Sequence, residues 1–293
     1  MNTKGIILAA GKGTRLMPAT IPASKPLLPL YDKPMIYYPL ETLIRIGIKD
    51  ILFIVQEEDL PIFKKTFGSG DHVGLNFSYE IQKIQKGIAD AYFIAEEFLQ
   101  GSPSVLALSD NVFLGKKYFE YASYALDKML NTGASVFGLP VPDPEKFGVI
   151  ELDQNDKIID IVEKPAVPKS NLIIPGMYFF DSKASSYTKT LKPSPRGELE
   201  ITDLIKIYLN MQNLSLQRLD ETIVWHDTGS AEALLSASQK VRQFEKDHHI
   251  KLGSYEIASF EMGFITAMEL EKIADKFIKS DYGQAIKNYL LKI

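Results

Sequence analysis

Three absences bound what this 293-residue chain can be. Cysteine is missing, which excludes a disulfide framework and any metal site built on thiolates. No apolar run approaches the roughly 18 residues of a membrane span, and the run from Gly5 to Ala10 is too short for an export signal. Excess positive charge is missing too, since the formal net charge is -4. We expect a soluble, cytoplasmic protein with no membrane or nucleic-acid partner.

What is present suits a compact α/β protein, with 45% hydrophobic and 24% charged residues. In the first half, short apolar runs alternate with segments of helical periodicity, which is the pattern of βαβ units on a largely parallel sheet. The apolar runs are 5–10, 50–55 and 104–110, and the helical segments are 34–46 and 87–98. This alternation predicts a Rossmann-like fold, with a mixed, mostly parallel sheet flanked by helices.

The second half changes character at about residue 134. Four strand-like runs follow one another without long helices, which predicts added antiparallel or mixed strands; they are 134–141, 147–153, 157–165 and 173–180. Beyond residue 229 the sequence becomes helical, with two apolar stripes formed by Leu234, Leu235, Val241, Phe244, then Leu270, Ile273, Ala274, Phe277 and Ile278. We expect a core over 1–240, in halves 1–133 and 134–240, with a helical extension over 241–293 packed on the same domain.

The loop after the first apolar run contains the glycines of two well-known phosphate motifs without matching either. A dinucleotide fingerprint needs a third glycine where Leu16 stands, three residues beyond Gly13. A Walker A loop needs a glycine six residues before its lysine, but Ile6 holds that place relative to Lys12. Both readings therefore fail.

What remains is a strand that leads into a glycine-rich turn. Its backbone can present several N–H groups to an anion, and Arg15 supplies a forked cation at its end. A polyphosphate meets those requirements. From the loop alone, an ordinary turn with Arg15 and Lys25 as solvated surface charges is an equally good interpretation.

Longer motifs favour the phosphate interpretation. The segments "GKGTRLMPAT" and "SKPLLPLYDKPMIYYPLETL" resemble the signature of the sugar-1-phosphate nucleotidyltransferases. The likeness continues in register over nearly the whole chain, through "LSDNVF", "DPEKFGVIELD", "VEKPAVPKSN", "IPGMYFFD", "PSPRGELEITD" and "HDTGS". In that family the sugar phosphate attacks the α-phosphate of a nucleotide in line and pyrophosphate leaves, so the protein mainly positions two anions.

The resemblance also implies substrates, a cofactor and an assembly. The nearest pattern implies dTTP and α-D-glucose 1-phosphate as substrates, with dTDP-glucose and pyrophosphate as products, at the start of dTDP-rhamnose synthesis. It implies Mg²⁺ as cofactor and a homo-oligomer, a tetramer in most members. UTP in place of dTTP is the first alternative, and a catalytically silent regulator that binds nucleotide sugars is the second.

Family positions transfer onto this chain residue by residue. Three implied catalytic residues are Arg15, Lys25 and Asp110. The implied nucleotide-binding residues are Leu8, Ala10, Gly11, Gly13, Thr14, Gln82 and Gly87. The implied sugar-phosphate residues are Asn111, Gly148, Glu163, Lys164, Tyr178 and Arg196, and the implied metal ligands are Asp110 and Asp227. Both aspartates end strand-like runs, where open α/β sheets bind ligands.

Three positions depart from the family pattern. Ser109 stands where relatives usually have glycine, Asp90 stands where they have glutamine, and 83–86 reads "KIQK" where they have a loop with proline. The added acid and hydroxyl bear on contacts to the base or ribose. They concern nucleotide preference more than the type of reaction.

Overall fold

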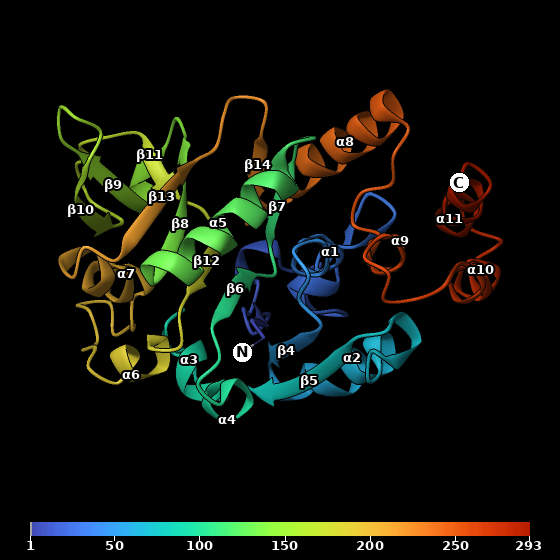
Figure 1. The fold of residues 1–293 in the computed structure, drawn as a ribbon, viewed down its shortest axis with the longest axis horizontal. Helices are drawn as coiled ribbons and strands as arrows, with labels where there is room; N and C mark the ends of the chain where they lie inside the picture. Colours follow the sequence, from blue (N-terminus) through green and yellow to red (C-terminus); the bar gives the residue numbers. More distant parts are fainter. Residues whose placement is uncertain (1) are drawn as a thin grey trace.

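The computed structural model describes residues 2–293 and contains a ten-stranded mixed sheet flanked by helices (Figure 1). The strand order is β10-β9-β11-β8-β12-β6-β1-β4-β5, and β13 also pairs with β8. Its strands are β1 (Lys4–Leu8), β4 (Asp50–Val55), β5 (Asn76–Ile81), β6 (Ser104–Leu108), β8 (Ala134–Pro140), β9 (Gly148–Leu152), β10 (Ile158–Glu163), β11 (Leu172–Ile174), β12 (Met177–Phe180) and β13 (Leu214–Arg218). The predicted fold class is confirmed.

The first half of the sheet is parallel, as the apolar runs predicted. Strand β1 pairs in parallel with β4 and β6, and β4 pairs in parallel with β5. Strands β1, β4 and β6 are continuous apolar runs because helices cover both faces of the sheet there, whereas β5 at the edge alternates polar and apolar residues. Ile6 and Ile7 are neighbours on β1, yet each belongs to a different buried cluster, one on either face.

The second half is mainly antiparallel, again as predicted. Strand β12 lies between β6 and β8 and runs antiparallel to both, while β9, β10 and β11 extend the sheet in alternating directions. Two short pairs stand outside this sheet: β2 (Pro29–Leu30) with β3 (Lys33–Pro34), and β7 (Asn111–Leu114) with β14 (Val224–Asp227). The second of these pairs carries site residues.

Eleven α-helices are present in the described part of the chain: α1 (Tyr37–Arg45), α2 (Leu60–Phe67), α3 (Ala91–Ile94), α4 (Glu96–Leu99), α5 (Tyr118–Thr132), α6 (Ala184–Thr188), α7 (Ile201–Asn210), α8 (Ala231–His248), α9 (Tyr255–Glu261), α10 (Ala267–Lys276) and α11 (Asp281–Leu290). The predicted helix over 34–46 begins only at Tyr37, because the β2–β3 hairpin uses the preceding residues. The predicted helix over 87–98 begins at Ala91 and is interrupted at Ala95. None of the helices in 2–293 is long and apolar enough to cross a bilayer.

The last three helices, α9, α10 and α11 (orange-red to red in Figure 1), pack on the same core as β1 and α1. Leu270, Ile273 and Ala274 are buried as expected. Of the predicted stripe on α8, Val241 is buried and Leu234 and Phe244 pack against the same cluster, whereas Leu235 is 54% exposed. The proposed boundary between 240 and 241 falls inside α8, and the division of the chain stays a prediction.

One carboxyl group in this region predicts how stability depends on pH. Glu256 in α9 is fully buried, its Oε2 accepts hydrogen bonds from the hydroxyls of Ser254 and Tyr282, and burial raises its pKa to about 7. Above the unfolded pKa the folded state keeps a proton that the unfolded state has released. The free energy of unfolding therefore falls as the pH rises through the window from 4.5 to about 7.

We expect Glu256→Gln to remove this loss. At a pH about one unit above the window, its free energy of unfolding should exceed that of the wild type by on the order of 2 kcal/mol, and the difference should vanish near pH 4.5. Urea unfolding of both proteins across this range measures the difference. A constant difference at every pH would contradict the prediction.

Candidate active site

The candidate site begins at the edge where the parallel strands end. Because β1, β4, β5 and β6 run in the same direction, the loops that follow them meet at one edge of the sheet. The backbone N–H of Ser109 donates to the carbonyl of Leu8 at 3.2 Å, and that of Gln82 donates to the carbonyl of Val55 at 2.9 Å. The glycine-rich loop after β1, the segment that begins at Gln82, and Asp110 after β6 are thus neighbours, although they are distant in sequence.

The two glycines of the opening loop meet different needs. Gly13 has φ +60°, and a β-carbon there would lie 2.9 Å from the side chains of Thr20 and Lys25, so only glycine fits without strain. Gly11 has no atom within 4 Å of such a β-carbon, which leaves open space above its backbone. That space lets an anion approach the loop closely.

Asp110 and Asp227 come together through a short antiparallel pair rather than through the main sheet. Strand β14 pairs with β7 so that Asp227 lies opposite Asn111, and the hydroxyl of Thr228 donates to the carbonyl of Asp110 at 2.9 Å. The expectation that Asp227 ends a strand is right, but its partner strand lies outside the ten-stranded sheet. Burial raises the pKa of Asp227, and the charge of Asp110 adds to the rise.

Cations surround these two carboxylates. The ammonium of Lys25 donates to Asp110 Oδ2 at 2.5 Å, with its side chain only 10% exposed. The guanidinium of Arg15 and Asp227 Oδ1 both lie close to the α-carbon of Gly229, at 3.0 and 3.2 Å from where a β-carbon would stand. The charges of Lys25 and Arg15 oppose the rise in the pKa of Asp227. The interpretation of Lys25 as a solvated surface charge is therefore disfavoured, whereas Arg15 remains exposed.

The two aspartates fit a divalent cation that receives its other ligands from elsewhere. Among residues 2–293 no group of three or more His, Asp or Glu side chains could hold a metal ion by itself. A magnesium ion needs only one or two protein carboxylates when substrate phosphates and water complete its coordination. The repulsion that raises the pKa of Asp227 is the kind that a bound cation relieves.

Asn111 connects this pair to the loop before β12 and to β14. Its Oδ1 accepts hydrogen bonds from the backbone N–H of Gly176 at 2.9 Å and from the indole N–H of Trp225 at 2.7 Å. Its Nδ2 therefore faces Asp110 and donates to Oδ1 at 2.9 Å. The sequence interpretation missed Trp225, although it is the sole tryptophan and stands two residues before Asp227.

A cavity of about 440 Å³ opens beside these residues. Eight of the residues that the resemblance implied line it: Arg15, Asp110, Asn111, Gly148, Glu163, Lys164, Tyr178 and Asp227. Trp225, Phe147 and Thr202 line it as well and were not predicted. The hydroxyl of Thr202 donates to Glu163 Oε2 at 3.2 Å. Burial raises the pKa of Glu163, and the nearby ammonium of Lys164 opposes that rise.

Arg196 does not line this cavity. Its guanidinium donates to Glu198 at 2.6 Å and to Glu200 at 2.9 Å, and it lies 3.8 Å from Glu163. The structure thus brings Arg196 to the rim and engages it with carboxylates. His226 does not line the cavity either, and burial lowers the pKa of its imidazole.

The implied nucleotide-binding residues lie on the loops next to the cavity rather than in its wall. Leu8 is the last residue of β1, and Ala10 lies in the loop that follows. The side-chain amide of Gln85 donates to the carbonyl of Ala10 at 2.5 Å, which joins this loop to the one after β5. Gly87 has φ +102°, and a β-carbon there would lie 2.4 Å from the carbonyl oxygen of Leu199. A side chain at position 87 would push the loop that contains Gly87 away from the backbone of Leu199.

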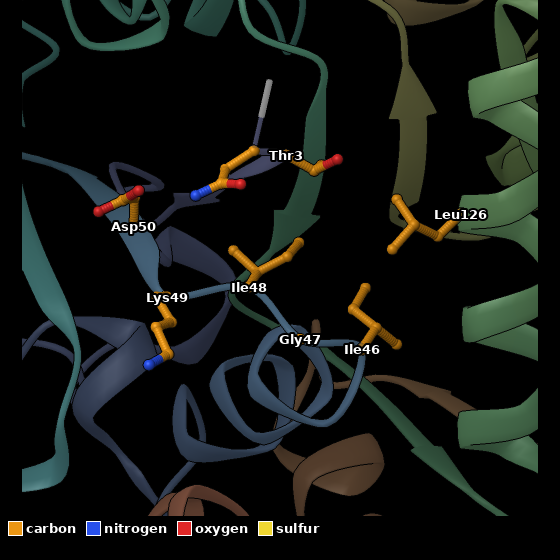
Figure 2. Close-up of a pocket in the computed structure, with 8 residues that line it drawn as sticks. Thr3, Ile46, Gly47, Ile48, Lys49, Asp50 and Leu126 are labelled. Carbon is orange, nitrogen blue, oxygen red and sulfur yellow. The ribbon is translucent and has the colours of Figure 1, made fainter. Parts of the chain in front are cut away.

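Two other cavities lie away from this edge. One of about 310 Å³ is found at the opposite ends of β1 and β4, where Figure 2 shows the apolar side chains of Ile46, Ile48 and Leu126. The other, of about 910 Å³, lies between α1, α8 and the C-terminal helices and is lined by Arg45, Glu245, Lys251 and Tyr289 among others. Neither contains a residue that the sequence singled out.

Comparison with known proteins agrees with this geometry. Residues 4–243 match the family described as nucleotidyl transferase. The chain belongs to the nucleotidyl transferase family. The match covers the whole ten-stranded sheet and part of α8. The family generally uses a divalent metal ion and acts on a nucleoside triphosphate and a sugar phosphate.

Several members of the nucleotidyl transferase family resemble the chain over almost its full length. Glucose-1-phosphate thymidylyltransferase from Xanthomonas campestris pv. campestris is 45% identical over 281 residues, covering 96% of this chain and 95% of the relative. The enzyme of that name from Neisseria meningitidis is 42% identical over 290 residues, with 99% of both chains covered.

Solved structures show the same fold. The crystal structure of a candidate glucose-1-phosphate thymidylyltransferase from Bacillus anthracis, in complex with sucrose, superposes with a TM-score of 0.77 at 38% identity, covering 87% of this chain and 98% of that one. A UDP-glucose pyrophosphorylase complexed with UDP-glucose reaches a TM-score of 0.73 at 24% identity, with 83% and 99% covered. At that identity the second likeness concerns the fold alone.

Proposed function

We propose that this member of the nucleotidyl transferase family transfers a deoxythymidylyl group from dTTP to α-D-glucose 1-phosphate, which gives dTDP-glucose and pyrophosphate. The relatives most similar over the full length carry the name of this activity. They do not favour the uridylyltransferase alternative. The observation that carries the proposal is the cavity in which Arg15, Asp110, Glu163, Lys164 and Asp227 meet from separate segments.

On the sugar side, the residues of the cavity supply both polarities that glucose 1-phosphate needs. The Lys164 ammonium is available to the phosphate, and Glu163 can accept hydrogen bonds from sugar hydroxyls. Gly148 lets the wall of the cavity close against Thr202, because a β-carbon there would lie 2.7 Å from Thr202 Cγ2. With Asn111 and Tyr178 these groups hold the phosphate oxygen as the attacking nucleophile, so no protein nucleophile is required.

On the nucleotide side, the open backbone at Gly11 and the cations Arg15 and Lys25 receive the triphosphate. An in-line attack at the α-phosphate leaves pyrophosphate on the opposite side, where its growing charge needs compensation. Lys25 supplies that compensation from a position held by Asp110, and Arg15 supplies it from the end of the loop, near Asp227. Leu8, Ala10, Gly13 and Thr14 shape the loop.

The cofactor proposed for this site is Mg²⁺, held by Asp110 and Asp227. A bound magnesium ion neutralises and orients phosphate oxygens. Lys25 holds Asp110 in place through their 2.5 Å contact, and Asn111 fixes the other oxygen of the same carboxylate. The implied homotetramer, and the assignment of 1–133 to the nucleotide and 134–240 to the sugar, stay predictions.

Purified protein tested with a matrix of nucleoside triphosphates and sugar 1-phosphates, scored for pyrophosphate, tests this proposal. We expect dTTP with glucose 1-phosphate to be the best pair, and UTP to be about fourfold worse, since the thymine methyl adds roughly 0.8 kcal/mol of apolar burial. CTP should be nearly inactive, because its base edge mismatches the amide of Gln82. A silent regulator would release no pyrophosphate with any pair.

A further inference from the structure

The segment from Gln82 to Asp90 contains a buried contact between its two end residues, and none of the roles proposed above depends on that contact. Asp90 and Gln82 are 8% and 7% exposed, and Gln82 Nε2 donates to Asp90 Oδ2 at 3.0 Å. Gln82 follows β5, and Asp90 immediately precedes α3, so two separate elements hold the two side chains. Both ends of the contact are therefore fixed by backbone.

This contact determines which way the amide of Gln82 faces. An amide can turn over and exchange its oxygen and nitrogen at little cost, unless a neighbour distinguishes them. An ionised carboxylate offers only acceptors, so it holds the nitrogen and repels the oxygen. In the described part of the chain, Gln82 Oε1 accepts no hydrogen bond and is not fully enclosed. The acceptor is thus left for a ligand.

We propose that Asp90 is a specificity-determining residue that locks the polarity of the base-reading amide and so excludes cytosine nucleotides. The inference rests on the proposed function, in which Gln82 reads the base. With Nε2 held by Asp90, Gln82 offers Oε1 to a base N3–H and its second N–H to O4, the pattern of thymine and uracil. Cytosine presents an unprotonated N3 and an amino group. It would need the amide turned over, which would set Gln82 Oε1 against the carboxylate.

Asp90→Asn tests this, since an asparagine has nearly the same shape but can turn its own amide and donate to Gln82 Oε1. We expect the ratio of kcat/KM for dCTP to that for dTTP, with glucose 1-phosphate, to rise about tenfold or more. A residue that merely supported the fold would lower both values together and leave their ratio unchanged. Asp90→Ser also removes the carboxylate that holds the amide, so it carries the same prediction and replaces Asp90→Asn if that variant does not fold.

Two further variants sharpen the result. Asp181→Asn is the matched control, because Asp181 also accepts a hydrogen bond, from Tyr208 at 2.6 Å. It follows β12, which runs antiparallel to β6, so it lies where the parallel strands begin, far from the loops of the site. The ratio should therefore stay unchanged in this variant. In a Gln82→Ala background, Asp90→Asn should no longer change the ratio. An unchanged ratio in Asp90→Asn, or a change that survives in Gln82→Ala, overturns the inference. Failure of the wild type to make dTDP-glucose from dTTP overturns the proposed function itself.

Discussion

Asp227→Asn should lower kcat by on the order of 100-fold, because it removes one of the two charges proposed to hold the magnesium ion. Asparagine keeps the shape and one oxygen of the side chain, so KM for glucose 1-phosphate should change much less than kcat. A higher Mg²⁺ concentration should restore part of the lost activity. Steady-state kinetics over a series of Mg²⁺ concentrations measures both effects.

Asp227→Asn should make the metal-free protein more stable, although it lowers its activity. Burial and the charge of Asp110 raise the pKa of Asp227, which means that the ionised carboxylate is disfavoured in the folded protein. A neutral asparagine should therefore raise the Tm of the protein without metal at neutral pH. Asp220→Asn, in the turn before β14, is a control with no expected effect on kcat. A normal kcat in Asp227→Asn would rule out a metal role for this residue.

Lys164→Ala should raise KM for glucose 1-phosphate by roughly 10- to 100-fold, because a hydrogen bond between charged groups contributes about 1.5–3 kcal/mol. KM for dTTP should stay close to the wild-type value, since Lys164 directly follows β10, in the part of the chain proposed for the sugar, and forms its ion pair with Glu163. Initial rates with each substrate varied in turn separate the two constants.

The matched control is Lys169→Ala. Lys169 is exposed and pairs with Glu151 at 2.9 Å, away from the cavity, so its loss should leave both KM values unchanged. Equal increases in the two KM values for Lys164→Ala would mean that Lys164 acts on the fold or on both substrates. The proposed contact with the sugar phosphate would then be wrong.

Local pattern was a good guide wherever local forces decide. The apolar runs at β1, β4 and β6 predicted parallel strands, since a strand covered on both faces must be apolar along its length. Periodicity alone does not tell which apolar residues of a helix enter the core: Leu235 on α8 is 54% exposed, whereas Val241 is buried. Periodicity shows that a helix has an apolar stripe, whereas the neighbours that cover part of that stripe are set elsewhere in the chain.

The candidate site divides in the same way. By itself the sequence determined the strand-then-glycine loop, the positions of the acidic and basic residues, and the family resemblance, because each of these is written in consecutive residues. Only the tertiary structure decided that Asp227 meets Asp110 through the β7–β14 pair, that Trp225 orients Asn111, that Arg196 stays at the rim with Glu198 and Glu200, and that Asp90 holds Gln82. The first two contacts join segments far apart in the chain, so they depend on how the sheet and its loops pack together. The last two join residues no more than eight positions apart, but they depend on the path of the loop between them, which the residue types alone do not specify.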